Sequence, residues 1–255
     1  MTIKPKKTTA KTPDPRIEKY RIVVRADQLA LNHNFVLGAG DYRFYLEGVY
    51  IEAAPHGATL VATDGQRMGV FRCDGGIVAT PAIVKLPKSV HAIASKPVRA
   101  QIIGTKAEPT KELFPWIAIA ADEPEFGTVL AAIVDAPDAT IAMQALDGGF
   151  RSVRWFGAVE IIEGAYPEWR RVVPTDFAST KKGPPAFQNK YVTAFKKISR
   201  VIRLHPGSDE TAALIETDRD DFFGVLMPMR SETRMVKNGK SATPDWAGIV
   251  GKEKS

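Results

Sequence analysis

The residue types that catalyse reactions are present in this sequence, but their spacing forms no recognisable reactive constellation. Cys73 is the only cysteine, which excludes a disulfide framework and a thiolate zinc site. Gly38 and Gly40 make the only GxG pattern, and the GxGxxG, GxxxxGK[ST] and GxSxG motifs do not occur. The four histidines are too far apart for a metal site of the HxxxH kind: His33, His56, His91 and His205. We therefore expect no cofactor, no metal and no catalytic residue.

One acidic group deserves comparison with a cation-binding loop. Asp218, Asp220 and Asp221 resemble a calcium or magnesium loop only loosely, because the glycine and the distal glutamate of such a loop are missing. We interpret the group as a turn between two strands. A hydrolase or nuclease on a sheet scaffold is kept as a hypothesis, and the lack of a metal or nucleophile arrangement counts against it.

Three other segments are better candidates for function, because no catalytic account explains them. They read VATDGQRM (61–68), EGAYPEWRRVVP (163–174) and GVLMPMR (224–230). Taken singly, each is also consistent with a plain structural role: a hairpin turn, a strand that leaves its sheet at Pro167, and an apolar last strand. Methionine side chains are flexible and polarizable, so they suit a groove that accepts several peptides.

Short strand patterns separated by glycine-rich turns must position these segments. Alternation of apolar and polar residues predicts strands over 20–25, 43–53, 58–63, 68–72, 82–86, 99–104, 116–121, 140–146, 152–156, 158–163, 212–217 and 222–227. Three helices are predicted, over 27–37, 88–95 and 189–203. The fold class is therefore α+β, with antiparallel sheets that carry a few helices.

The predicted helix 189–203 carries two stripes. Tyr191, Phe195, Ile198 and Ile202 recur at helical spacing and form an apolar face. The second stripe is basic and comprises Lys196, Arg200 and Arg203, with Lys190 and Lys197 beside them. It is our candidate for a DNA-facing surface. An ordinary solvated helix face would show the same pattern.

The charge of the chain is concentrated in particular segments. The 255 residues carry a net charge of +6, and residues 1–19 and 232–255 account for all of it. Both ends have the composition of solvated, disordered tails. Between them the net charge is zero but sorted, with +8 over 170–207 and −7 over 105–169. Such sorting suits a protein that meets a polyanion on one face only.

No apolar run has the length of a membrane span and no signal peptide is recognisable, so we expect a cytoplasmic protein without membrane contact.

In their order along the chain, the three segments resemble the bacterial DNA polymerase III β subunit, the sliding clamp. That family carries a [RY]YLxGxxxE strand followed by VATDGHRL, then GxFPDYRRVxP, and ends in VMPMRL. Here RFYLEGVYIE (43–52) precedes the first segment, Gln66 replaces the family's His, and 24 residues follow Ser231. The resemblance implies a clamp fold, ring-forming, with sheets outside and helices lining an inner surface.

The resemblance also implies a hydrophobic pocket that binds peptides of replication proteins. The matching positions lie on the first strand and turn, on the interdomain segment and on the last strand. They are Leu46, Thr63, Gly65, Arg67, Met68, Pro174, Val225, Met227, Pro228, Met229 and Arg230. Arg67 and Arg230 would meet polar or acidic residues of the peptide.

The length implies a shortened form without the family's N-terminal domain. We expect tails at 1–19 and 232–255, one domain over 20–174 with extra strands at about 105–136, and a second domain over 175–231. Equal division would instead place the boundary near 136. Two short domains per chain predict a trimeric ring around duplex DNA. The resemblance implies that this ring serves a DNA polymerase and other clamp-binding proteins, and that a clamp loader opens it. The alternative is a clamp-fold peptide-binding module that never closes and modulates a true clamp.

Overall fold

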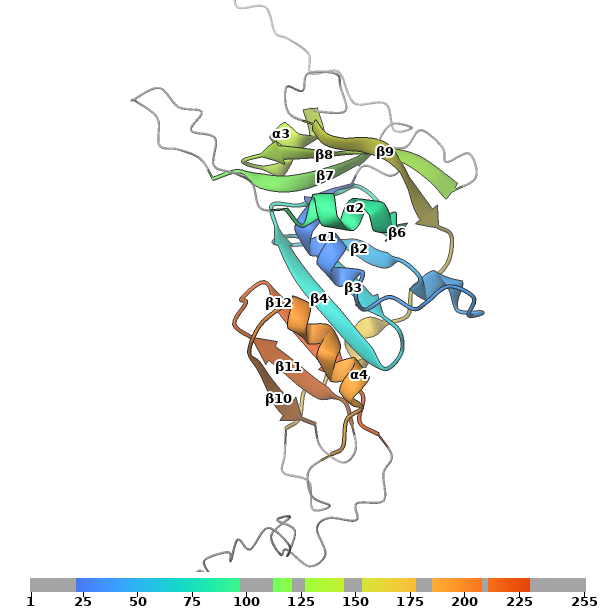
Figure 1. Cartoon of the computed structure of the whole chain (residues 1–255), viewed down its shortest axis with the longest axis vertical. Helices are drawn as coiled ribbons and strands as arrows, with labels where there is room; N and C mark the ends of the chain where they lie inside the picture. The colour runs from blue at the N-terminus through green and yellow to red at the C-terminus, as the bar shows by residue number, and fades with distance from the viewer. Residues whose placement is uncertain are drawn as a thin grey trace, which may run out of the picture.

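The computed structural model describes residues 22–96, 112–120, 127–144, 153–177, 185–207 and 211–229. The strands within these residues form one antiparallel sheet of twelve, in the order β10-β11-β12-β4-β3-β2-β6-β9-β8-β7-β1-β5 (Figure 1). The sheet is open, with β10 at one edge and β5 at the other. The predicted α+β class is therefore confirmed. Both tails, and the strand predicted over 99–104, lie outside the described residues.

The first part of the chain is a strand, a helix and a three-stranded meander. Turn residues place the breaks: Asp64-Gly65 connects two of the meander strands, and Gly65 has a φ of +88°, which favours glycine. We call the strand, the helix and the meander together unit 1. Its elements are β1 (Ile22–Arg25), α1 (Ala26–Asn32), β2 (Val49–Ala54), β3 (Gly57–Thr63) and β4 (Arg67–Asp74), with a 3₁₀ turn η1 (Phe44–Leu46) before β2 and the short β5 (Ile77–Val78) after β4.

Unit 2 repeats the same order of elements. It consists of β6 (Ala82–Lys85), α2 (Lys88–Ala94), β7 (Phe114–Ala120), β8 (Thr128–Ala136) and β9 (Val153–Ile162), with α3 (Ala139–Gln144) between the last two. The strands β7 and β8 take the places in unit 2 that β2 and β3 take in unit 1. The prediction of a strand over 140–146 was wrong, since alternation in so short a run did not separate strand from helix.

The two units exchange their first strands. β1 of unit 1 pairs with β7 of unit 2, and β6 of unit 2 pairs with β2 of unit 1. In each unit the first strand of the meander is therefore covered by a strand from the other unit. A domain boundary near 136 would fall inside unit 2, whereas the repeat ends with β9 at Ile162.

A third, incomplete unit follows. It contains α4 (Asn189–Val192), the 3₁₀ turn η5 (Thr193–Lys197), β10 (Ile202–Pro206), β11 (Ala213–Thr217) and β12 (Phe222–Leu226). The prediction of one helix over 189–203 was wrong beyond Lys197. The Ser199 hydroxyl donates a hydrogen bond to the carbonyl oxygen of Val201 (2.6 Å) and accepts one from its N–H (3.0 Å), and such local bonds compete with helix.

The helices α2, α1 and α4 follow one another along one side of the sheet (Figure 1). Beneath α1 and η5 the core is aromatic: the ring centroids of Phe35 and Phe195 lie 5.1 Å apart, and those of Phe222 and Phe71 lie 4.7 Å apart with the rings tilted. Gly69 of β4 and Gly224 of β12 are direct cross-strand partners under these rings. A Cβ at Gly69 would lie 2.6 Å from Phe35, and one at Gly224 would lie 2.2 Å from Phe195. The glycine pair therefore lets the helix layer approach the sheet.

Candidate peptide-binding site and DNA-facing surface

The face of the sheet opposite the helices carries a second, smaller core. Because side chains alternate along a strand, Met68 and Val70 of β4 point away from the helices, beside Val61 of β3 and Val225 of β12. With Ala212 these residues form a buried group, which we call the Met68 cluster. The cluster joins strands of unit 1 to a strand of the third unit, so an apolar site here is built between the two.

The segment 163–174 packs over the Met68 cluster. The Tyr166 ring stacks on Tyr50 with centroids 4.8 Å apart, and its hydroxyl donates to the carbonyl oxygen of Val61 (3.4 Å). Burial raises the pKa of the Tyr166 phenol, so it stays a neutral donor. Trp169 packs against the cluster beneath the Arg170 guanidinium, which lies 4.3 Å from the indole centroid and pairs with Glu52. This segment therefore forms one wall of the candidate pocket.

The last strand and the β3–β4 turn form the opposite rim. The backbone N–H of Met227 donates to the carbonyl oxygen of Gln66 (2.8 Å), which holds the end of β12 beside the turn. The Thr63 hydroxyl fixes that turn by donating to the carbonyl of Arg67 (2.8 Å) and accepting from the N–H of Gly65 (3.0 Å). Met227 and Met229 remain 37% and 42% exposed, so both thioethers are accessible to a partner.

The structure brings most, but not all, of the predicted pocket residues together. Thr63, Gly65, Met68, Val225 and Met227 lie at one place, with Pro228 and Met229 following on the chain. Pro174 continues the covering segment and lies against Gly207. A Cβ added to Gly207 would lie 3.3 Å from the Cβ of Pro174. Leu46 is buried on η1 and is not part of the Met68 cluster. Arg230 lies outside the described residues.

Arg67 does not share the face of Met68. Its guanidinium pairs with Asp64 (Nε to Oδ2, 3.0 Å) and lies 5.9 Å from the Phe35 ring centroid and 5.6 Å from that of Tyr191. These rings belong to the helix side of the sheet. Arg67 therefore connects unit 1 to α4, and its contact with a peptide's polar or acidic residues stays a prediction.

The predicted DNA-facing cations do not form one stripe, because the helix that would align them ends at Lys197. Arg203 lies on β10, where it pairs with Glu216 of β11 (2.8 Å). Lys190 lies 4.5 Å from the Tyr191 ring centroid, and Lys197 donates to Asn34 Oδ1 (2.8 Å). Lys196 and Arg200 are exposed. Four of the five cations thus remain on or directly after α4 and η5, in the helix layer.

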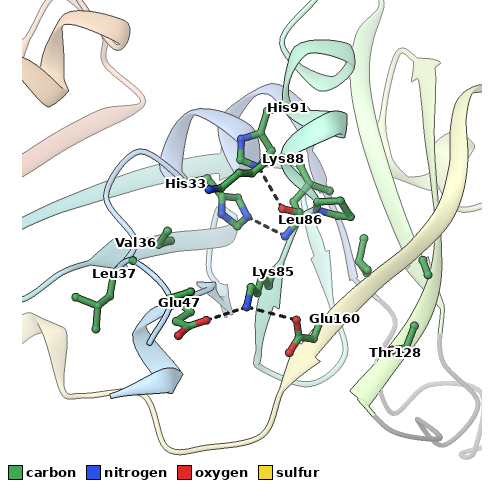
Figure 2. Close-up of a pocket in the computed structure, with 15 residues that line it drawn as sticks. His33, Val36, Leu37, Glu47, Lys85, Leu86, Lys88, His91, Thr128 and Glu160 are labelled. Atoms are coloured by element: carbon green, nitrogen blue, oxygen red, sulfur yellow. Dashed lines mark hydrogen bonds and ion pairs between the residues drawn. The ribbon is translucent and has the colours of Figure 1, made fainter. Parts of the chain in front are cut away.

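Sequence reasoning missed a cavity of about 510 Å³ where units 1 and 2 meet. Figure 2 shows Lys85 at its wall between Glu47 and Glu160, with Nζ–O distances of 2.8 and 3.6 Å. The rings of His33 and His91 flank Leu86 in the same view, their centroids 4.7 Å apart. No local motif contains these residues, since they lie just after α1 and η1, at the end of β6, on α2 and on β9. Only the strand exchange brings them together.

Both histidines at this cavity are held neutral. Burial, followed by the nearby His91 and Lys85, lowers the pKa of His33 to about 3. Its Nε2 accepts the N–H of Leu86 (3.0 Å), so the neutral tautomer carries its proton on Nδ1. Burial also lowers the pKa of His91, whose Nε2 lies 3.2 Å from the carbonyl oxygen of Leu86. The pair therefore anchors the β6–α2 junction without adding charge near neutral pH.

No protein-family model matches the sequence, and no curated protein matches it. Solved structures of bacterial sliding clamps do match. The clamp of Bartonella birtlesii bound to griselimycin is 15% identical with a TM-score of 0.54, over 89% of this chain and 70% of that one. The griselimycin-bound clamp of Pseudomonas aeruginosa (16%, 0.53, 88% and 68%) and the Bacillus subtilis clamp (14%, 0.53, 88% and 67%) are similar. The chain therefore has the sliding-clamp fold and spans about two thirds of the length of these clamps, as expected for a shortened form.

Two further findings concern the described residues only. None of their helices is long and apolar enough to cross a membrane. Nor do they contain a group of three or more His, Cys, Asp and Glu side chains placed to hold a metal ion. Cys73 is buried, and burial raises the pKa of its thiol to about 12, so the thiolate that a nucleophile needs does not form near neutral pH.

Proposed function

We propose that this protein is a sliding clamp: a processivity factor that encircles duplex DNA in the cytoplasm and holds a DNA polymerase through a hydrophobic peptide pocket. The observation that carries the proposal is the fold, in which α2, α1 and α4 follow one another along one side of an antiparallel sheet (Figure 1) and exposed cations lie on or just after α4 and η5. It acts without an active site of its own. Its partners are DNA, the polymerase, other clamp-binding proteins and a clamp loader that opens the ring.

The DNA side needs only weak, sequence-independent attraction. A ring is held on DNA by topology, so its inner surface has to attract phosphates without gripping them. Lys196 and Arg200 on the helix layer supply exposed cations, and Lys190 and Lys197 extend the same surface. The sorting of charge noted above favours DNA at this face, because the acidic residues are concentrated in the 105–169 segment.

The peptide side is the rim of the Met68 cluster. Apolar side chains of a partner would pack against Met227 and Met229, with Trp169 and Val173 behind them. The two methionines can change rotamer at low cost, so different replication proteins can share the site. The pocket and the DNA surface lie on opposite faces of the sheet, which lets the clamp hold a polymerase while it slides.

The proposal is tested on nicked circular DNA. The full-length protein is loaded with the clamp loader of its own replication system, and the circle is then cut once. We expect the protein to remain on the closed circle in high salt and to leave after linearisation, because only a topological link has these properties. Release at the same rate from circular and linear DNA would contradict the ring.

A second function is favoured by one observation: among the described residues, β10 pairs with β11 on one side only, so the sheet of a single chain is open there. A chain that stayed a monomer would be a peptide-binding module that competes with a true clamp for its partners. Such a module would bind clamp-binding peptides normally and would show no dependence on DNA ends. The linearisation assay, run beside a peptide-binding assay, separates the two functions.

A further inference from the structure

The methionines of this chain differ sharply in their exposure. Four of the six lie within the described residues. Met68 is 2% exposed at the centre of the Met68 cluster, and Met143 packs against the main core. Met227 and Met229, in contrast, are 37% and 42% exposed. The candidate peptide site therefore combines one protected thioether with two that small reagents in solution can reach.

The backbone holds Met227 and Met229 at the rim. The N–H of Met227 donates to the carbonyl oxygen of Gln66 (2.8 Å), and the N–H of Met229 donates to that of Ala186 (2.7 Å). Pro228 between them has a fixed φ. Side chains two residues apart in an extended segment share one side, so Met227 continues the face on which Val225 lies beside Met68. The exposure of the two methionines is thus a fixed feature of the site.

Cys73 does not compete with these methionines for an oxidant. Its side chain is buried, and burial raises the pKa of its thiol to about 12. Peroxides attack the thiolate, and this form is absent near neutral pH at such a position. Among the sulfur atoms of the described residues, the two rim thioethers are therefore the ones open to oxidation.

We propose that Met227 and Met229 are a modification site, where a hydroperoxide forms methionine sulfoxide and so closes the rim to peptides. The sulfur lone pair attacks one peroxide oxygen, the O–O bond breaks and an S–O bond forms. Sulfur loses two electrons to the peroxide, and the proton of the transferred hydroxyl leaves with the departing hydroxide as water. This regulation rests on the proposed function, because it acts on the same peptide site.

A sulfoxide weakens peptide binding because it adds a dipole to a surface that binds by excluding water. In the free protein the new oxygen is hydrated. An apolar peptide side chain packed on it would remove that water, and the side chains of Met68 and Val225 have no donor to replace it. An unpaired polar group buried in this way lowers affinity by about tenfold or more.

Mass spectrometry of the full-length protein tests the site of modification. Trypsin places Met68 in the fragment 68–72 and both rim methionines in the fragment 220–230. Brief treatment with hydrogen peroxide should add one and then two oxygen atoms to the fragment 220–230 while the fragment 68–72 stays unmodified. The denatured protein is the control, and in it both fragments should be oxidised at similar rates. Similar rates in the native protein would overturn the proposal.

Fluorescence polarisation tests the effect on binding. The probe is a labelled synthetic peptide from the clamp-binding segment of the DNA polymerase of the same replication system. Catalase removes the peroxide before the probe is added, so the probe itself is not oxidised. We expect the dissociation constant to rise about tenfold after treatment. It should return to its first value when the two stereospecific methionine sulfoxide reductases, supplied with a thiol, remove the oxygen as water.

Leucine variants assign the effect to the rim. Met227→Leu combined with Met229→Leu removes both sulfur atoms and nearly conserves the apolar volume. The dissociation constant of this double variant should be the same before and after peroxide, whatever its starting value. Met68→Leu is the matched control: it keeps both rim thioethers, so peroxide should weaken its binding by the same factor as in the native protein.

Two results would overturn the regulation alone. One is an unchanged dissociation constant in protein whose fragment 220–230 is fully oxidised. The other is a loss of affinity that the double leucine variant shares. An untreated protein that binds no peptide would refute the peptide site of the proposed function, and this regulation with it. The two failures are distinguishable, because peptide binding is measured before any oxidant is added and oxidation is measured by mass.

Discussion

Gly224→Ala tests whether the glycine pair sets the distance between the helix layer and the sheet. The new Cβ would lie 2.2 Å from Cε1 and 2.9 Å from Cζ of Phe195, and 3.2 Å from the carbonyl oxygen of Met68. Phe195 is wholly buried and touches Phe35 and Phe222, so its ring has no free space in which to move. The variant must displace η5 or the sheet.

Overpacking of this kind costs about 1–3 kcal/mol. In a chain of this size each kcal/mol lowers the Tm by roughly 2–4 °C, so we expect a fall of about 2–12 °C in a calorimetric or circular dichroism melt. Gly38→Ala is the control, because an added Cβ there meets no atom within 4 Å. Exposed positions of that type change stability by less than about 0.5 kcal/mol.

A double variant makes the test specific. Phe195→Leu removes the ring atoms that the new Cβ would strike, so Gly224→Ala should cost less in that background than in the native one. Equal costs in both backgrounds, or a Tm for Gly224→Ala that matches Gly38→Ala, would refute the reasoning. Either result would mean that the glycine pair does not control the approach of the helix layer.

Three further predictions concern DNA, peptide and pH. Replacing both Lys196 and Arg200 by alanine should make the slope of log K for DNA binding against log salt concentration shallower by up to about 0.9 per lost phosphate contact. Arg203→Ala should change the slope little, because Arg203 is already paired with Glu216. Equal slopes for the two variants would refute the assignment. Met227→Ala should weaken a clamp-binding peptide by about 1–2 kcal/mol in calorimetry with the Tm unchanged, and unaltered affinity would place the site elsewhere. His33 has a folded pKa of about 3, below the 6.5 of the unfolded chain, so the unfolded state binds more protons between these values and stability should fall as the pH drops from 6.5 towards 3. His33→Gln should flatten that part of the stability profile, and an unchanged profile would contradict the burial of His33.

Local pattern was enough to predict much of the fold. β3, β4, β11 and β12 lie where the sequence placed them, because each is a short apolar run with turn residues at its ends. The failures have a common cause. The residues after Lys197 keep helical periodicity, yet Ile202 pairs with Thr217 across the sheet and Ser199 bonds to Val201, and neither contact is visible in the periodicity. Here tertiary pairing overrode local propensity.

The candidate site was predictable only in part, for a similar reason. Motif resemblance found Met68, Val225 and Met227, which the fold places together. It did not find that Arg67 points to the helix side, because a strand turns neighbouring residues to opposite faces and the register was unknown. The cavity at Lys85 was out of reach altogether, since its walls come from both exchanging units.

The exchange of first strands has a consequence for how the chain folds. β1 and its partner β7 are about ninety residues apart in the sequence, so neither unit can complete its sheet until both have been made. Folding should therefore be slow and concerted for its size, as for other chains dominated by distant contacts. A cut between Val78 and Ala82 would leave two fragments, each with the strand that the other lacks. Mixed together, they should reassemble by complementation, whereas either alone should stay unfolded.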